Sequence, residues 1–410
     1  MSDFFQNGVI TTLHNLTRRT AEDLEAKLMG YRHRRPMILM IPSLYSELER
    51  PALANIVQIL KQVPYLQRLV VGLDQANEAE YRHAIKYFSE LPFEVTVIWN
   101  HGPRMQALQK NLAEYGLSTV EEGKGKNVWN SMGYVLSLNK DAVVALHDAD
   151  IVTYSRDMLA RLFYPVANPN FGFYFCKGFY PRWTEEKLNG RVCRLLVTPL
   201  VRALQKVVGH TPYLDYIDTF RYPLAGEFSM RTSVMKDVRI PSDWGLEIGI
   251  LTEMEKTFSS QRICQVDIAD VYDHKHQDLS PDDHSTGLSK MATDISKSFF
   301  RKLATHGVVL STETFRSVKA TYYRIALDLV ESYRKDAMFN GLNFNIHGEE
   351  KAVELFASTI MEAGANFLEN PMETPFIPCW RRVISAIPSF FDDLNDAVEK
   401  DMQDYGPVKE

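Results

Sequence analysis

The chain is poor in cysteine, and its few cysteines form no metal-binding or redox motif. Four cysteines occur in 410 residues, and no two of them are spaced as C-x-x-C. Scattered cysteines of this kind are typical of reduced, buried thiols rather than of a disulfide framework. The chain also lacks an apolar run long enough to span a membrane, and its first residues lack the pattern of a signal peptide. We therefore expect a cytoplasmic protein with no membrane partner.

Charge of one sign is not in marked excess. Lysine and arginine number 46 against 52 aspartates and glutamates, which gives a formal net charge of −6. No basic stripe stands out, so the composition argues against a nucleic-acid partner. The apolar fraction of 45% and the charged fraction of 24% are ordinary for a globular protein. The length suffices for one large core or two domains.

Strands and helices alternate along the first 150 residues. Apolar runs predict strands at 37–42, 68–73, 93–99 and 142–147. Periodic segments predict helices at 3–30, 51–62, 76–89, 103–115 and 127–138. The alternation predicts an α/β fold with a mostly parallel, doubly wound sheet.

The pattern changes in the second half of the chain. Further strands are expected at 171–176 and 265–269, with helices at 191–208 and 246–258. Later helices are expected at 315–337, 349–367 and 380–402. We divide the chain into an N-terminal helix (1–30), a first α/β half (31–155), a second half (156–292) and a helical C-terminal region (293–410).

Two aspartates end the predicted strand at 142–147. Asp148 and Asp150 flank Ala149, and carboxylates at the carboxyl end of a central strand lie where open α/β sheets bind ligands. Hard oxygen ligands suit Mg²⁺ or Mn²⁺, which usually also hold substrate phosphates. An exposed turn with two aspartates is the alternative for this motif taken alone.

Other polar residues follow strands at the same predicted edge. Lys124, in a Gly-Lys-Gly run, opens the helix before the Asp148 strand, where a helix N-terminus and a cation favour a diphosphate. Glu47 follows the first strand and could accept from a base or sugar, or simply cap a helix. Asp74 ends the second strand and could face a nucleotide or lie in a turn.

The second half offers candidates for a sugar, a metal and a small anion. Ala225 and Gly226 form a small-residue turn whose amides could face a sugar, and Glu247 opens a predicted helix. His274 and His276 follow a strand, and a histidine is a natural third ligand beside carboxylates. Gly190 and Arg191 begin another helix, which suits a phosphate or carboxylate. An ordinary turn explains the glycine motifs about equally well.

Taken in order, these motifs resemble those of a family, the retaining GT-A glycosyltransferases that make glucosyl-3-phosphoglycerate, and of their mannosyl counterparts. The resemblance covers roughly residues 37–305. It rests on Pro42 at a strand end, Gly123-Lys124-Gly125, Asp148-Ala149-Asp150, Gly190-Arg191-Val192, Pro223-Leu224-Ala225-Gly226-Glu227, Gly245-Leu246-Glu247-Ile248-Gly249 and Lys275-His276. It implies a GT-A fold with a helical C-terminal extension, a nucleotide-sugar-binding first half and an acceptor-binding second half.

The resemblance also implies a role for each matching residue. Donor-binding residues would be Pro42, Ser43, Leu44, Glu47, Asp74, Lys124, Asp148, Ala149, Ala225 and Gly226. Acceptor-binding residues would be Gly190, Arg191 and Cys193, where the family commonly has a threonine at the last position. Asp150 and His276 would hold Mg²⁺ or Mn²⁺, and Glu247 and Asp150 are the candidate catalytic residues.

The implied reaction is metal-dependent, retaining transfer of a hexose from a nucleotide-sugar to 3-phosphoglycerate, for glucosylglycerate synthesis. Glucose is favoured over mannose, but the sequence leaves UDP-hexose and GDP-hexose open as donors. A homodimer is expected. The leaving phosphate itself would deprotonate the acceptor hydroxyl, so no base is assigned.

Two rival interpretations belong to other classes. Asp148-Ala149-Asp150-Ile151-Val152 also fits the nucleophile loop of haloacid-dehalogenase-type phosphohydrolases, with Asp282-Asp283 as the distal metal pair. Three predicted strands precede this motif, whereas that nucleophile normally follows the first strand. The non-enzyme alternative is a nucleotide-sugar-binding scaffold, against which the candidate metal ligands argue.

Overall fold

A computed structural model describes residues 6, 8–118, 122–184, 186–241, 245–274, 287–371 and 376–406. At its centre lies an eight-stranded sheet of order β1-β11-β6-β9-β5-β2-β3-β4. Every neighbouring pair is parallel except those that β9 makes with β5 and β6. The predicted α/β fold with a mostly parallel, doubly wound sheet is confirmed.

The strands of this sheet are short and buried. They are β1 (Thr11–Leu13), β2 (Met37–Leu44), β3 (Leu66–Asp74), β4 (Glu94–Trp99), β5 (Val143–Leu146), β6 (Phe175–Phe179), β9 (Phe228–Arg231) and β11 (Ile263–Asp267). Two small pairs lie outside it, formed by β7 (Trp183–Thr184) with β8 (Lys187–Leu188) and β10 (Ile240–Pro241) with β12 (Phe376–Ile377). Because helices cover both faces, the central strands read as nearly continuous apolar runs.

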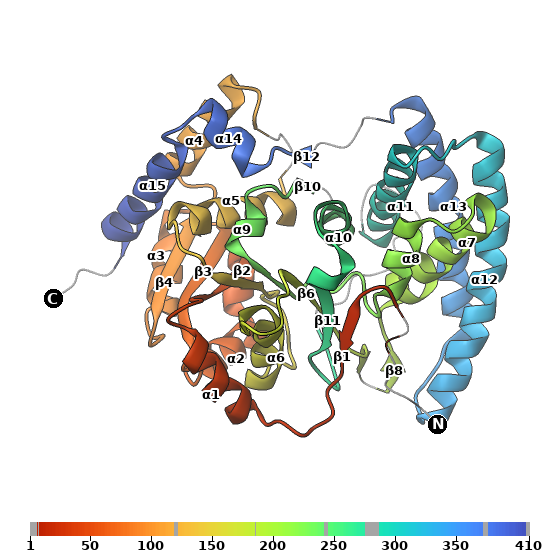
Figure 1. The fold of residues 1–410 in the computed structure, drawn as a ribbon, viewed down its shortest axis with the longest axis horizontal. Helices are drawn as coiled ribbons and strands as arrows, with labels where there is room; N and C mark the ends of the chain where they lie inside the picture. Colours follow the sequence, from red (N-terminus) through yellow and green to blue (C-terminus); the bar gives the residue numbers. More distant parts are fainter. Residues whose placement is uncertain are drawn as a thin grey trace.

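Helices surround the sheet and form most of the C-terminal region (Figure 1). The first half carries α1 (Ala21–Tyr31), α2 (Pro51–Leu60), α3 (Glu78–Phe88), α4 (Pro103–Glu114), α5 (Lys124–Ser137) and α6 (Arg156–Ala167), with the 3₁₀ helix η1 (Tyr45–Glu49). The second half carries the π-helix η2 (Val192–Val197), α7 (Thr198–Val208), α8 (Pro212–Thr219), α9 (Thr232–Met235), α10 (Leu246–Thr257) and the 3₁₀ helix η3 (Ser260–Arg262). The remaining helices are α11 (Gly287–Thr305), α12 (Thr312–Phe339), α13 (Ile346–Glu369), α14 (Trp380–Ala386) and α15 (Phe390–Tyr405).

The N-terminal helix expected over residues 3–30 is wrong for residues 8–20, the described stretch before α1. Residues 11–13 form the edge strand β1, which pairs in parallel with β11 through Thr11 and Cys264. The helix starts only after Thr20, whose side chain accepts from the Asp23 amide. Leucine spacing suggested a longer helix, but pairing with a strand some 250 positions away overrides local periodicity.

Two further elements differ from expectation. The strand expected at 171–176 is displaced to β6, because Gly172 has a φ of +72° and the chain turns there. The helix expected at 380–402 is two helices, since Pro388 cannot continue one and the chain turns between α14 and α15.

The C-terminal region divides between the two sides of the sheet (Figure 1). Helices α11, α12 and α13 pack on α7 and η2, beside the second half. Helices α14 and α15 return to the first half, where α15 packs on α4, α5 and β4. The Trp380 ring stacks on Trp129 of α5 with 3.9 Å between centroids, and it fills the space beside Gly133. The end of the chain therefore completes the core of the first half.

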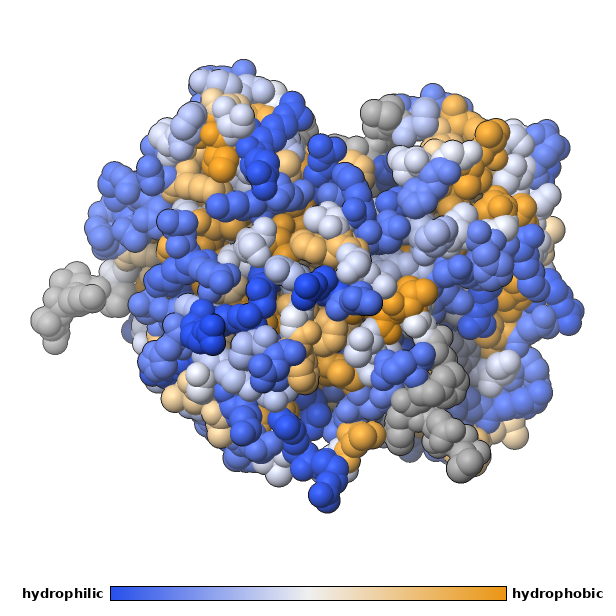
Figure 2. Space-filling view, viewed as in Figure 1, coloured by the Kyte–Doolittle hydropathy of each residue, from blue (hydrophilic) through white to orange (hydrophobic). Residues whose placement is uncertain are grey.

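The face of the molecule drawn in Figure 2 is mostly hydrophilic. Figure 2 shows apolar residues in small, scattered groups on the face drawn there. Exposed apolar side chains include Val309 and Phe339. In the described part of the chain, no helix combines the length and the apolar character that a membrane crossing requires.

We predict that Trp380→Ala lowers the free energy of unfolding by about 3–5 kcal/mol, because it removes a buried ring and leaves a cavity against Trp129. Denaturant unfolding would measure the loss. Phe339→Ala is the control, since its ring is exposed and the change should stay within about 0.5 kcal/mol. Equal effects of the two substitutions would contradict the assigned packing.

Candidate active site

The candidate site lies where the order of the strands reverses. Strands β2 and β5 are parallel neighbours, and the chain continues from β2 outward to β3 and β4 before it returns to β5. Crevices at the carboxyl ends of such strands are the usual ligand sites of open α/β sheets. Ser43 and Leu44 end β2, and Asp148, Ala149 and Asp150 follow β5.

An ion-pair triad joins three elements at this point. Lys124 is the first residue of α5, and its Nζ lies 2.7 Å from Oδ1 of Asp148 and 3.2 Å from Oε1 of Glu247 in α10. Burial opposes the charge of Lys124, but the two carboxylates outweigh it and hold the pKa of Lys124 above its ordinary value. Burial alone would raise the pKa of Asp148, and the Lys124 ammonium instead holds it low. The pair is therefore ionised.

The turn at Ala225 and Gly226 lies directly against Asp148. A Cβ atom at Gly226 would come within 2.5 Å of Oδ2 of Asp148, so a side chain there is excluded. The next residue, Glu227, is fully buried and accepts hydrogen bonds of 2.6 Å from the hydroxyls of both Tyr180 and Tyr272. Burial and the Asp148 charge raise the pKa of Glu227. The turn is thus held rigidly beside the triad.

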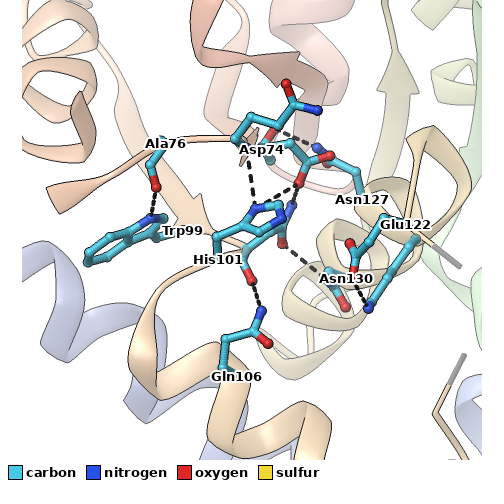
Figure 3. Close-up of polar contacts among 12 residues, drawn as sticks. Asp74, Ala76, Trp99, His101, Gln106, Glu122, Asn127 and Asn130 are labelled. Carbon is cyan, nitrogen blue, oxygen red and sulfur yellow. Dashed lines mark hydrogen bonds and ion pairs between the residues drawn. The ribbon is translucent and has the colours of Figure 1, made fainter. Parts of the chain in front are cut away.

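A second cluster, shown in Figure 3, surrounds Asp74 at the end of β3. The amide of Asn100 donates to Oδ1 of Asp74 at 2.8 Å, and Nδ1 of His101 lies 4.0 Å from the same atom. Asn127 of α5 also bonds Asp74, while its amide donates to the Gly72 carbonyl at 2.8 Å. Burial raises the pKa of Asp74. Asp74 is therefore a positioned, partly buried acceptor beside the site rather than a loose turn residue.

The remaining donor candidates lie on β2 and η1. Pro42 and Ser43 belong to β2, where Ser43 is buried and donates to the Leu44 carbonyl at 2.9 Å. Leu44, the last residue of β2, is more than one-third exposed. Glu47 is buried in η1 with its carboxylate 3.6 Å from Nε of Arg50.

The metal candidates lie only partly within the described residues. Asp150 follows β5, and its Oδ2 lies 3.6 Å from Nδ1 of His274. His276 and Asp282-Asp283 lie outside the described residues. Within the described ranges, no group of three or more His, Cys, Asp or Glu side chains is arranged around one point as a metal site. Two carboxylates and an imidazole nevertheless suit a divalent ion in their chemistry.

The anion candidates Gly190 and Arg191 sit at the entrance to η2. Gly190 has a φ of +75°, a conformation that favours glycine. Nε of Arg191 lies 2.7 Å from Oε1 of Glu349, and NH2 of Arg194 lies 2.9 Å from the other oxygen of the same carboxylate. Glu349 belongs to α13 and is buried. The C-terminal helices thus hold the arginine of this loop.

Arg194 stabilises the loop that contains Gly190. Its Nε donates to the Asn189 carbonyl at 2.8 Å, and its guanidinium lies 4.8 Å from the centre of the Tyr333 ring. Cys193 is buried beside it, and burial raises the pKa of this thiol to about 12. Cys193 therefore presents a neutral thiol, a weaker donor than a hydroxyl.

Sequence reasoning assigned no role to Glu227, which it named only within a motif, or to Glu349. It named His274 beside His276 but expected His276 to be the metal ligand. A buried glutamate beside a glycine turn was the available signal for Glu227, and proximity to a strand end was the signal for His274. No local pattern links Glu349 to Arg191, because they are 158 positions apart.

We predict that Gly226→Ala destabilises the fold by about 1–3 kcal/mol, because the new Cβ forces Asp148 away from Lys124. Gly30→Ala in α1 is the matched control, since nothing lies within 4 Å of the added atom. Denaturant midpoints of the two variants would be compared. A Gly226 variant as stable as the Gly30 variant would contradict the close approach.

No family model matches the chain. The glucosyl-3-phosphoglycerate synthase of Persephonella marina is 46% identical over 404 residues, covering 98% of this chain and 100% of the relative. The enzyme of the same name from Methanococcoides burtonii is 37% identical over 407 residues, covering 98% and 99%.

Solved structures resemble the chain in fold. A crystal structure of glucosyl-3-phosphoglycerate synthase from Mycobacterium tuberculosis with Mn²⁺, UDP-glucose and phosphoglyceric acid matches with a TM-score of 0.53 at 19% identity, over 74% of this chain and 90% of that one. A second, with Mg²⁺ and UDP, has a TM-score of 0.50 at 20% identity and covers 72% and 86%. With two relatives at 37–46% identity over nearly their whole length, the chain belongs to the glucosyl-3-phosphoglycerate synthases, a family of glycosyltransferases with the GT-A fold.

Proposed function

We propose that this chain transfers the glucosyl group of UDP-glucose to 3-phosphoglycerate with retention, using Mg²⁺ or Mn²⁺. The names of its relatives support glucose over mannose, and they argue against the phosphohydrolase. The observation that carries the proposal is the triad of Lys124, Asp148 and Glu247 at the point where the strand order reverses. It provides a half-buried cation for a diphosphate beside a carboxylate for a sugar.

The donor would lie across the carboxyl ends of β2, β3 and β5. We assign the uridine to Pro42, Ser43, Leu44, Glu47 and Asp74, the ribose to Asp148 and Ala149, and the hexose to Ala225, Gly226 and Glu247. The Lys124 ammonium has three donor protons, so it can bind a diphosphate oxygen while it keeps a carboxylate. Partial burial of this cation reduces the screening by water of its attraction for the diphosphate.

Asp150 would hold the divalent ion, together with His274 or His276. A bound Mg²⁺ or Mn²⁺ supplies a Lewis acid that stabilises charge on the leaving diphosphate. The chain's own contribution is Lys124, which stabilises the same developing charge through a donor fixed in advance. Asp148 keeps Lys124 charged and oriented.

In the proposed reaction, the bond between C1 of glucose and the β-phosphate oxygen breaks and its electron pair stays with UDP. The hydroxyl oxygen of 3-phosphoglycerate bonds C1 on the same face, and its proton passes to the leaving phosphate. No side chain is assigned as base. Glu247 would orient the hexose hydroxyls, a role that agrees with its place in the triad.

The acceptor would bind at the Gly190 loop. Arg191 would meet the phosphate of 3-phosphoglycerate through its Nη groups, since its hydrogen bond to Glu349 is donated by Nε. Cys193 contributes little to a phosphate because its thiol is a weak donor. The homodimer expected for this chain stays a prediction.

The activity is tested by incubating the protein and Mg²⁺ with UDP-glucose or GDP-mannose, with and without 3-phosphoglycerate. We expect acceptor-dependent release of UDP from UDP-glucose and no acceptor-dependent release of GDP from GDP-mannose. Asp150→Ala should abolish metal-dependent turnover while circular dichroism shows an intact fold. Full activity of this variant would refute the metal role, and no acceptor-dependent release from either donor would refute the function.

Arg191→Ala should raise the KM for 3-phosphoglycerate about 10- to 100-fold, the loss of a charge-assisted hydrogen bond to phosphate. The KM for UDP-glucose should stay near that of the wild type. Arg324→Ala is the control, because that arginine is exposed on α12 and pairs only with Asp328 among the described residues. An unchanged acceptor KM in Arg191→Ala would move the acceptor elsewhere.

A further inference from the structure

A lysine that no catalytic role requires is buried beneath the candidate hexose site. Lys177 lies in β6, where it pairs with Phe228 of β9 on one side and with Gln265 of β11 on the other. Its side chain is 1% exposed. Burial lowers the pKa of Lys177 to about 8, against the opposing effect of Glu247 and Glu227. A cation in the middle of a sheet is costly, so its contacts must compensate for the lost water.

The contact that Lys177 makes is with the backbone of the hexose turn. Its Nζ donates to the carbonyl oxygen of Ala225. In a trans peptide the carbonyl oxygen and the following N–H point in opposite directions. A carbonyl drawn down onto Lys177 therefore turns the N–H of Gly226 away from the sheet interior.

Other anchors fix the rest of the same turn. The Ala225 amide donates to the Tyr222 carbonyl at 3.1 Å, and the Glu227 carbonyl accepts from the Gly178 amide at 2.9 Å. The Glu227 side chain is held by two tyrosines. Among the described residues, none accepts a hydrogen bond from the N–H of Gly226. Within the described part of the chain, the anchors of the turn thus leave this N–H without an acceptor, and Gly226 borders Asp148.

We propose that Lys177 is a positioning residue that sets the peptide between Ala225 and Gly226, so that the Gly226 N–H is presented to the transferred hexose. The inference rests on the proposed function, because it assumes a hexose beside this turn. Lys177 itself touches no reacting atom. It acts on the sugar end of the donor, whereas Lys124 acts on the diphosphate end.

This division of labour gives a measurement that general damage to the fold would not reproduce. UDP carries the nucleotide and the diphosphate but no hexose, so its affinity should not depend on the Gly226 N–H. Lys177→Met keeps the length of the side chain and removes the donor and the charge. We expect it to weaken UDP-glucose binding about 5- to 10-fold, the loss of about one hydrogen bond, with the affinity for UDP within about twofold of the wild type.

The matched control is Lys302→Met. Lys302 is a largely buried lysine of α11 whose Nζ lies 3.0 Å from Glu255, away from the candidate site. Lys302→Met removes a comparable buried charge, and its affinities for UDP-glucose and for UDP should both stay near those of the wild type. Titration calorimetry with UDP-glucose and with UDP, each with Mg²⁺, would provide the four comparisons.

Hydrogen exchange in the wild type tests the same idea without a substitution. UDP-glucose should slow exchange of the Gly226 amide, and UDP should not. This measurement decides the matter if Lys177→Met fails to fold. Equal protection by both ligands would overturn the inference.

The outcomes separate this inference from the function on which it rests. The role of Lys177 alone is overturned if Lys177→Met binds UDP-glucose as tightly as the wild type does. It is also overturned if the variant loses affinity for UDP and for UDP-glucose equally. A folded wild type that binds neither ligand overturns the proposed function together with this inference. Selective loss of UDP-glucose affinity supports it.

Discussion

The contact between Lys124 and Asp148 is the interaction on which the candidate site depends. It ties the first turn of α5 to the end of β5, and through Glu247 it reaches α10 in the second half. Two consecutive elements and a helix about one hundred positions further along the chain therefore meet at one ammonium group. Because the carboxylates and the ammonium keep each other charged, the site is arranged before any ligand arrives. Preorganised charge of this kind is what a leaving diphosphate requires, since no reorganisation is needed as the bond breaks.

Much of this arrangement could be predicted from local sequence, and the rest depended on distant contacts. Strands β2 to β5 were visible as apolar runs, and parallel topology then placed Ser43, Asp74 and Asp148 at one edge of the sheet. The edge strand β1 was not visible, because three residues gain their structure only by pairing with β11. The Arg191–Glu349 pair could not be predicted for the same reason. The spacing of charges along the chain does not identify a partner on a distant helix.

The C-terminal region supports a different half of the molecule on each side of the sheet. On one side, Glu349 of α13 is the buried carboxylate that pairs with Arg191 and Arg194. Helix α13 therefore supports the candidate acceptor loop directly. On the other side, α14 and α15 close the core of the first half. Helix α13 thus supports the half proposed to bind the acceptor, and α14 and α15 support the half proposed to bind the donor.

The packing of Trp380 against Trp129 and Gly133 has a consequence for how the chain folds during its synthesis on the ribosome. Strands β2 to β5 and α5 are synthesised early, but part of the outer surface of α5 is covered by residues near the end of the chain. Until those residues have left the exit tunnel, α5 carries bare apolar surface. The first half is therefore synthesised early but completes its packing late, and apolar surface exposed during that interval makes a chain prone to aggregation.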